Sequence, residues 1–258
     1  MSIGSFTLIK NEIPWIEQHI ENAAPHLDEM VFFDGNSDDG THEVLHRMAD
    51  KYKNIKVVCA KDPGNLLEDY TRLSNEAMHT LKTDWGMFLH PDMWVENPEQ
   101  FRAAGKMQGA ALSVDMTSYA GDPDGQLFKI SAGRSRAWKN IYRLRNPDLG
   151  AHYHGHYGAA NEDVYFYQIT GDSHDFFGPD FGRYPYEVLD SGLRIHHFSD
   201  VRPRERRYQR MATCLRNQGC PPDRIDELAR THPRVSLVPT EYFKLTPCED
   251  PRRVPSHA

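Results

Sequence analysis

The chain has 258 residues, 39% of them hydrophobic, and a formal net charge of −7. This length suits one large domain, or one domain with a C-terminal extension. The acidic balance argues against broad electrostatic capture of nucleic acid, and no run approaches the ~20 apolar residues of a membrane span. Because the N-terminus enters a strand pattern directly and the four cysteines form no CxxC pair, we expect no signal peptide, free thiols and a cytoplasmic location.

The first ninety residues alternate between strand and helix patterns. Asn11 is expected to cap the first helix, which carries Pro14 in its first turn, a position that proline tolerates. This alternation predicts an α/β fold with a mostly parallel central sheet flanked by helices. The expected strands are Ile3–Ile9, Met30–Phe33, Ile55–Cys59 and Trp85–Leu89, and the later helices are Thr41–Tyr52 and Leu67–Leu81.

After Asn97 the alternation stops. We expect strands at 109–118, 126–131 and 193–198 and helices at 204–217 and 222–230, while 139–190 reads as irregular. The predicted organisation is a main domain over 1–200 and a helical extension with a tail over 201–258. Within the main domain, 1–100 is predicted to be the nucleotide-binding half, and 101–200 the irregular half that completes the site.

An acid stands at the end of the second predicted strand. Asp34 is followed by the polar turn Gly35 to Gly40, and a helix begins near Thr41. A carboxylate at the carboxyl end of a strand, beside a helix N-terminus, is typical of nucleotide sites in open α/β sheets. We therefore expect Asp34 to accept a hydrogen bond from a donor base or ribose, or else to be an Asx-turn residue. Asp38 and Asp39 are expected to be solvated turn and cap residues.

The fourth predicted strand also ends in an acid, within His90-Pro91-Asp92. Two acid-tipped strands in one sheet suggest a nucleotide at one strand and a metal at the other. Oxygen ligands suit Mg²⁺ or Mn²⁺, with phosphate and water completing the coordination shell. The alternative for Asp92 is a helix cap or turn acid before Asn97-Pro98.

These motifs, in this order, resemble glycosyltransferase family two, whose fold is the GT-A fold. The resemblance is good over residues 3–100 and weak beyond, and His90 stands where the family carries the first acid of an Asp-x-Asp motif. The matching parts are Lys10-Asn11-Glu12, the Asp34–Thr41 element, Arg72 with Asn75, His90-Pro91-Asp92, and a later His196-His197 followed by the basic segment Arg202–Arg206.

The resemblance implies a metal-dependent, inverting glycosyltransferase that uses a nucleotide-diphosphate sugar, with a UDP-sugar favoured. Asp92 would be the first ligand of Mn²⁺ or Mg²⁺, and His196 or His197 the second, with the other histidine facing the core. An imidazole ligand favours Mn²⁺ over Mg²⁺. The expected donor-binding residues are Lys10, Glu12, Asp34, Arg72, Asn75 and His90.

Inversion requires a base that takes the proton of the acceptor hydroxyl. Asp163 is favoured slightly over His156 and Glu162. His156 belongs to an alternating run from His152 that is otherwise a partly exposed strand or a transition-metal site.

The acceptor is open between a glycan, a lipid-linked sugar, a protein and a modified nucleic-acid base. Six arginines between Arg202 and Arg216 read mostly as a solvated helical face, with phosphate capture as the functional alternative. The rival functions are a sugar nucleotidyltransferase and a non-catalytic, degenerate GT-A binding module.

Overall fold

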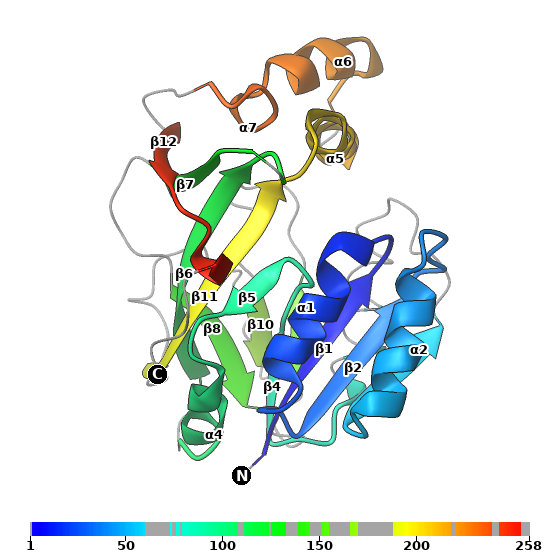
Figure 1. Ribbon diagram of the computed structural model, residues 1–258, viewed down its shortest axis with the longest axis vertical. Coiled ribbons are helices and arrows are strands. Elements are labelled where there is room, and N and C mark those ends of the chain that lie inside the picture. Colours follow the sequence, from blue (N-terminus) through cyan, green and yellow to red (C-terminus); the bar gives the residue numbers. More distant parts are fainter. Residues whose placement is uncertain are drawn as a thin grey trace. The chain divides into compact units, whose positions relative to one another are not determined.

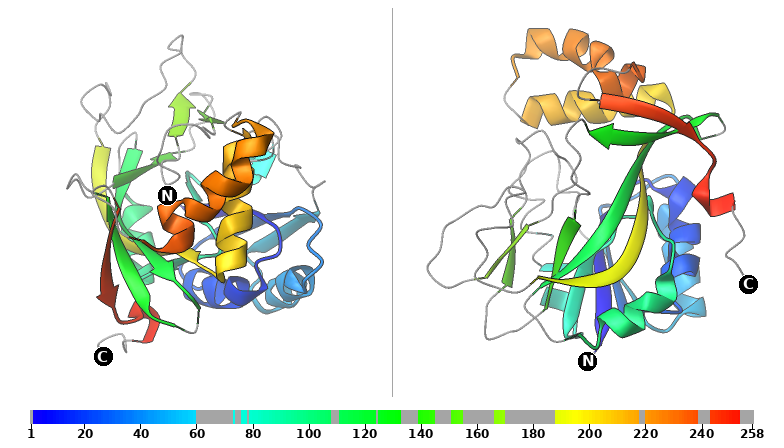
Figure 2. Two further views of the ribbon diagram at one scale, coloured as in Figure 1. Left: turned by 90° about the horizontal axis from the view of Figure 1, so that it is seen from above. Right: turned by 90° about the vertical axis from the view of Figure 1, so that its left-hand side faces the viewer.

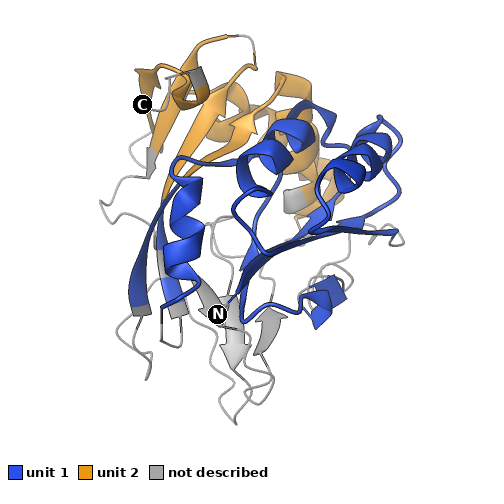
Figure 3. Ribbon diagram, turned by 60° about the horizontal axis from the view of Figure 1, so that its bottom comes forward, with its two compact units in different colours: residues 1–115, 138–194 blue, residues 116–137, 195–258 orange. Residues whose placement is uncertain are grey.

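The structure is a computed structural model in which the chain forms two compact units (Figure 3). Unit 1 contains residues 1–115 and 138–194, and unit 2 contains 116–137 and 195–258. Two strands, β6 (Ala111–Gly121) and β11 (Val188–Val201), continue from one unit into the other. The predicted division near residue 200 stays a prediction. The structure describes residues 2–59, 73, 76–77, 79–107, 111–123, 125–132, 139–144, 151–154, 166–169, 188–217, 220–238 and 243–253.

A parallel sheet forms the centre of unit 1. Its strand order is β3-β2-β1-β4, with β1 paired parallel to both β2 and β4. The strands are β1 (Ile3–Ile9), β2 (Glu29–Asp34), β3 (Ile55–Cys59) and β4 (Trp85–Phe88). The α/β prediction is confirmed, with β1 and β3 at the expected bounds and β2 one residue longer at each end.

The central strands are buried along most of their length, as expected for a parallel sheet covered on both faces. Phe6, Phe32 and Phe88 lie fully buried, one each on β1, β2 and β4, and Phe6 and Phe88 meet edge to face at 5.1 Å between ring centres. Their continuous apolar runs, rather than any alternation, are what made these strands recognisable in the sequence.

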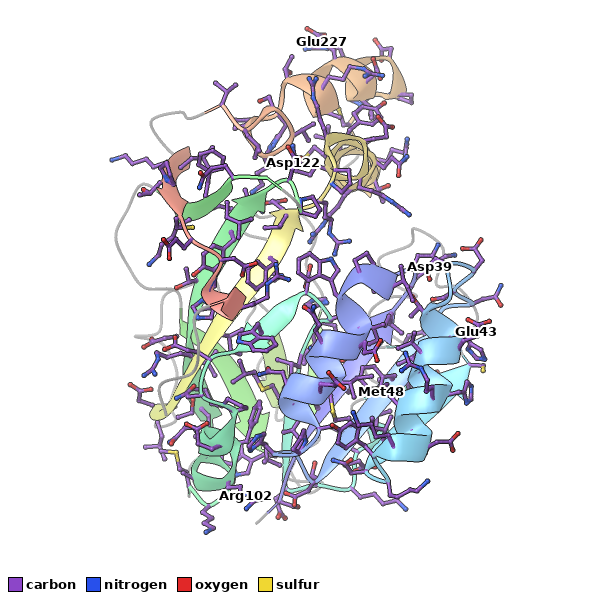
Figure 4. The ribbon with its side chains drawn as sticks, viewed as in Figure 1. Asp39, Glu43, Met48, Arg102, Asp122 and Glu227 are labelled. Atoms are coloured by element: carbon purple, nitrogen blue, oxygen red, sulfur yellow. The ribbon has the colours of Figure 1, made fainter. Side chains whose placement is uncertain are left out.

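Helices α1 (Ile13–Ala23) and α2 (Thr41–Lys51) lie side by side on one face of this sheet (Figure 1). Their inward side chains include Ile16 and Ile20 from α1 and Leu45 and Met48 from α2, and Figure 4 labels Met48. Two exposed ion pairs, Glu17–Arg47 at 2.8 Å and Glu21–Lys51 at 2.7 Å, join the outer faces. Exposed pairs contribute little, so burial of the apolar stripes holds these helices.

The expected Asn11 cap is wrong. The helix begins at Ile13 with Glu12 at the N-cap, and Glu12 makes no side-chain capping bond. Asn11 instead has a left-handed backbone, with φ of 57°, and its side chain bonds to Asp38. Pro14 does lie in the first turn, as predicted.

Unit 1 also contains several short elements, of which only a strand in the run from His152 was considered from the sequence. Strand β8 (Lys139–Leu144) pairs antiparallel with β4 and with the first part of β6, while β9 (Ala151–His154) and β10 (Phe166–Ile169) pair with each other. Strand β5 (Met93–Val95) pairs with β11 and is followed by η1 (Pro98–Gln100) and α4 (Phe101–Ala104). Among the described residues, no helix is long and apolar enough to cross a membrane.

Side chains of α1 hold β5 in place. His19 Nδ1 hydrogen bonds the carbonyl oxygen of Met93 at 3.1 Å. Asn22 donates to the Val95 carbonyl at 3.0 Å and accepts from the Val95 amide at 2.9 Å. The backbone that follows Asp92 is therefore held by α1, a helix that begins after the turn at the end of β1.

Unit 2 combines a small antiparallel sheet with a group of helices. The sheet order is β12-β7-β6, formed by β12 (Phe243–Cys248), β7 (Leu127–Ala132) and the end of β6. Figure 2 shows α5 (Arg204–Asn217) and α6 (Pro222–Thr231) side by side, followed by α7 (Pro233–Ser236); the short η4 (Pro251–Arg253) follows β12. The prediction of α5 is confirmed at both ends, whereas β12 and α7 were not predicted.

Arg207 departs from the expected solvated face of α5. Its side chain is only 4% exposed. It donates to the carbonyl oxygens of Gly121 at 2.6 Å and of Arg202, and to Asp122 Oδ1 at 3.1 Å. Figure 4 labels Asp122 beside α5. Arg207 thus ties the β6–β7 turn to α5, while Arg204, Arg206 and Arg216 are exposed as predicted.

Because His19 is buried, we expect the free energy of unfolding to depend on pH. Burial lowers the pKa of His19 to about 4, although the Met93 hydrogen bond and the Asp92 charge oppose the shift. Because the unfolded chain takes up this proton near pH 6.5, stability is full above that pH and falls by about 3 kcal/mol as the pH drops to 4. Chemical denaturation of His19→Gln at several pH values should show a shallower fall, whereas His46→Gln, at an exposed histidine, should keep the original slope.

Replacing Arg207 should destabilise unit 2. The variant Arg207→Met leaves carbonyl groups without their buried donor, which should reduce the free energy of unfolding by about 3 kcal/mol. The exposed neighbour provides the control, since Arg206→Met should change it by less than about 0.5 kcal/mol. Equal denaturation midpoints for the two variants would show that the Arg207 bonds add no stability.

Candidate donor site at the carboxyl edge of the parallel sheet

The strand order of unit 1 reverses between β1 and β4. The chain runs from β1 through β2 to β3 on one side, and β4 lies on the other side of β1. At this edge Thr7 Oγ1 donates to the Leu89 carbonyl at 2.6 Å. Open α/β sheets bind ligands outside the carboxyl ends of the strands at such a reversal. The exposed Lys10 follows β1 and the half-buried His90 follows β4, so both lie at this edge.

Asp34 ends β2 and is 1% exposed. Its Oδ1 accepts from the Ser37 amide at 3.1 Å and from the Ser37 hydroxyl at 2.6 Å. Its Oδ2 lies 2.8 Å from His42 Nδ1. The turn role of Asp34 is therefore observed, and its contact with a donor remains a prediction.

The turns that follow β1 and β2 interlock. The Asn11 amide donates to Ser37 Oγ at 3.0 Å, and Asn11 and Asp38 exchange two hydrogen bonds of 2.8 and 3.0 Å. The Glu12 amide donates to Thr41 Oγ1 at 2.9 Å. Glu12, a predicted donor residue, is thereby fixed beside the turn that contains Asp34.

Asp39 caps both helices that start at this edge. Its Oδ1 accepts from the amide and hydroxyl of Thr41 at 3.0 and 2.6 Å, and its Oδ2 accepts from the Ile13 amide at 3.2 Å. Burial alone would raise the pKa of Asp39, but the hydrogen bonds from Thr41 and Ile13 outweigh it and lower the pKa. The expectation of a cap residue is confirmed.

The turn after β4 places His90 and Asp92. The Met93 amide donates to the His90 carbonyl at 3.0 Å, which closes the turn. The His90 ring packs edge-on against Phe88, with ring centres 4.4 Å apart. Asp92 is 5% exposed and belongs to this turn, not to a helix start. A buried carboxylate at this edge has the oxygen chemistry that Mg²⁺ and Mn²⁺ favour.

Neighbouring histidines on β11 in unit 2 point to opposite sides of the strand. His196 is half-buried, and its Nδ1 lies 2.8 Å from the hydroxyl oxygen of Tyr119, whose ring stacks on Phe198 at 5.1 Å. His197 is 2% exposed. One of the pair thus faces the core, as expected, and His196 is the more accessible.

Five predicted site residues lie outside the described residues: Arg72, Asn75, His156, Glu162 and Asp163. The described part of unit 1 brings Lys10, Glu12 and Asp34 into adjoining turns and places His90 with Asp92 in a second turn at the same sheet edge. Sequence reasoning missed His42, the partner of Asp34. The available signal was its position in the first turn of a helix that follows an acid-tipped strand.

Within the described residues, no group of three or more His, Cys, Asp or Glu side chains could hold a metal ion.

No protein-family model and no curated protein matches the chain. Its structure is similar to S. aureus TarS 1–349 in complex with UDP, with a TM-score of 0.47 and 15% identity over 93% of this chain and 76% of that chain. Against the longer S. aureus TarS structure, the match covers 42% of that chain.

The structure is similar to that of the mannosyltransferase PcManGT from Pyrobaculum calidifontis in complex with GDP-Man and Mn²⁺. The TM-score is 0.47 and the identity 12%, over 92% of this chain and 73% of that chain. The structure is also similar to that of GalNAc-T7 with UDP, GalNAc and Mn²⁺, with a TM-score of 0.41 and 12% identity. This match covers 92% of this chain and 54% of that chain. At these identities and TM-scores the likenesses assign no substrate and no site residue to this chain.

Removing the Asp39 cap should weaken the start of both helices. Asp39→Ala is expected to cost about 1 kcal/mol of unfolding free energy, because it leaves backbone amides at two helix starts without their acceptor. Glu43, labelled near Asp39 in Figure 4, is exposed in the first turn of α2. Thermal and urea denaturation of Glu43→Ala should show at most about 0.5 kcal/mol of change. Equal losses in the two variants would contradict the capping role.

Proposed function

We propose that this protein is a metal-dependent glycosyltransferase of the GT-A type that moves a sugar from a nucleotide-diphosphate donor to an acceptor hydroxyl. The observation that carries the proposal is the reversal of strand order between β1 and β4, with polar turns at both carboxyl ends. One turn carries Lys10 and Glu12 and the other His90 and Asp92. A UDP-sugar is the favoured donor.

The donor-binding roles divide by chemistry. Glu12, Asp34 and Asn75 offer oxygen acceptors to the hydroxyl and N–H groups of a nucleoside. Lys10 and Arg72 would pair with the diphosphate, since a guanidinium or ammonium group forms charge-assisted bonds with phosphate oxygens. His90, in the turn after β4, would contact the donor ribose or the metal.

Asp92 is the residue that would hold the metal. When bound, Mn²⁺ or Mg²⁺ supplies positive charge that stabilises the leaving diphosphate. The prediction that His196 or His197 provides a second ligand stays open, and His196 is the more accessible of the two.

The transfer itself would be a direct displacement with inversion at the anomeric carbon. The acceptor oxygen attacks, the bond to the diphosphate breaks, and a base takes the hydroxyl proton. Asp163 is the proposed base, with Glu162 and His156 as alternatives. A glycan is the favoured acceptor, ahead of a modified nucleic-acid base or a lipid-linked sugar.

Two other functions share parts of this site. A sugar nucleotidyltransferase would usually carry a glycine-rich loop after β1, where this chain has Lys10-Asn11-Glu12. A non-catalytic binding module would explain His90 in place of an acid. Slow hydrolysis of a donor sugar nucleotide by the purified protein would favour the transferase over the binding module.

The metal role of Asp92 can be tested by calorimetry with UDP and GDP, each with Mn²⁺, Mg²⁺ or EDTA. We expect one diphosphate to bind in a metal-dependent way, and Asp92→Asn to weaken this binding at least ~10-fold because an amide is a poorer ligand than a carboxylate. Asp50→Asn, an exposed acid on α2, should bind as the wild type does. Metal-independent binding that Asp92→Asn leaves unchanged would exclude Asp92 as a ligand, and absence of any binding would overturn the proposed function.

A further inference from the structure

The exposed group at the end of β2 is an imidazole, not the carboxylate. The side chain of Asp34 is 2% exposed, whereas that of His42 is 36% exposed. Both oxygens of Asp34 already accept bonds, from Ser37 on one side and His42 on the other. A ligand at this turn would therefore meet His42 first.

Asp34 determines which nitrogen of His42 is available. A carboxylate oxygen only accepts, so the 2.8 Å contact requires the hydrogen on His42 Nδ1. In the neutral ring Nε2 then carries the lone pair and is a hydrogen-bond acceptor. The His42 ring also packs edge to face against the ring of His46, with ring centres 4.5 Å apart.

We propose that His42 is the residue that recognises the donor base, with Asp34 behind it as a positioning residue. Nε2 of His42 would accept a hydrogen bond from a ring N–H of the base. This inference rests on the proposed function, because it names a specificity residue of the same donor site. It changes the role of Asp34 from direct contact to orientation of the imidazole, as carboxylates do for histidines in many sites.

An acceptor at this position selects between bases. Uracil and guanine each have an N–H in the ring on their pairing edge, which can donate to Nε2. The corresponding ring nitrogens of adenine and cytosine are acceptors and would face the Nε2 lone pair without a proton between them. A buried or half-buried polar group left unpaired lowers affinity, so the site should prefer UDP or GDP over ADP and CDP.

A catalytic triad is a poorer reading of the same side chains. The Ser37 hydroxyl donates to Asp34 and not to the imidazole, so His42 is not placed to activate it. Ser37 is also tied to the Asn11 amide. The arrangement suits a fixed hydrogen-bonding surface.

Two substitutions separate ligand contact from support of Asp34. In His42→Asn the amide nitrogen takes the place of Nδ1 and still donates to Asp34, but no atom replaces Nε2. In His42→Gln the longer amide reaches the place of Nε2 and loses the short bond to Asp34. His46→Asn is the matched control, since it changes an exposed histidine one turn further along α2.

Binding of UDP, GDP, ADP and CDP is measured by calorimetry with Mn²⁺ present, alongside thermal unfolding of each variant. We expect the wild type to bind UDP or GDP at least ~10-fold more tightly than ADP and CDP. His42→Asn should lose this preference by a similar factor with its unfolding midpoint unchanged, His42→Gln should retain part of it, and His46→Asn should behave as the wild type.

The inference is overturned if His42→Asn keeps the base preference, or if only His42→Gln loses it, which would assign His42 to support of Asp34 alone. It is also overturned, with the donor site intact, if the wild type binds all four diphosphates equally and Asp92→Asn weakens all of them. If no diphosphate binds to the wild type, the proposed function fails and this inference fails with it.

Discussion

The buried carboxylate of Asp34 is the constraint on which the donor edge depends. A carboxylate that is 1% exposed must be paired and hydrogen bonded, because burying an unsatisfied charge is far more costly than any single packing contact. Ser37 satisfies one oxygen through its amide and hydroxyl, and His42 satisfies the other from the first turn of α2. Satisfying this one group therefore fixes the turn after β2 and the first turn of the helix that follows it.

Helix α1 contacts both the turn after β2 and the strand that follows Asp92. Its start is held to the β2 turn, because the Glu12 and Ile13 amides bond to Thr41 and Asp39. Further along, His19 and Asn22 bond to the backbone of β5, just after Asp92. The two turns that carry the candidate donor and metal residues are thus braced by one rigid element, which is the arrangement that precise positioning of polar groups requires.

The sequence predicted an element correctly where residues close in the chain determine it, and missed contacts made by distant residues. The residue ranges of strand β1 and helix α5 were predicted correctly, because a run of apolar residues and a helical composition are local signals. Asn11 was misread because its side chain bonds to Asp38 from another turn, which no neighbouring residue indicates. Arg207 resembled its exposed neighbours in the sequence, and only the β6–β7 turn, about 85 residues earlier, makes it a buried donor. His42 was missed for the same reason, since its pairing with Asp34 depends on the path of the turn between them.

His90, which stands where the resembling motif carries an acid, packs within the turn after β4. The imidazole packs edge-on against Phe88 at 4.4 Å, a contact with the last residue of the strand that a shorter carboxylate would not make. A neutral imidazole also carries one negative charge fewer than the acid of the resembling motif. Under the proposed function, a diphosphate near Lys10 and Asp92 would meet less repulsion from this turn than from a turn with two acids. The observed contribution of His90 to this turn is its packing against Phe88, and the acid of the turn is the buried Asp92.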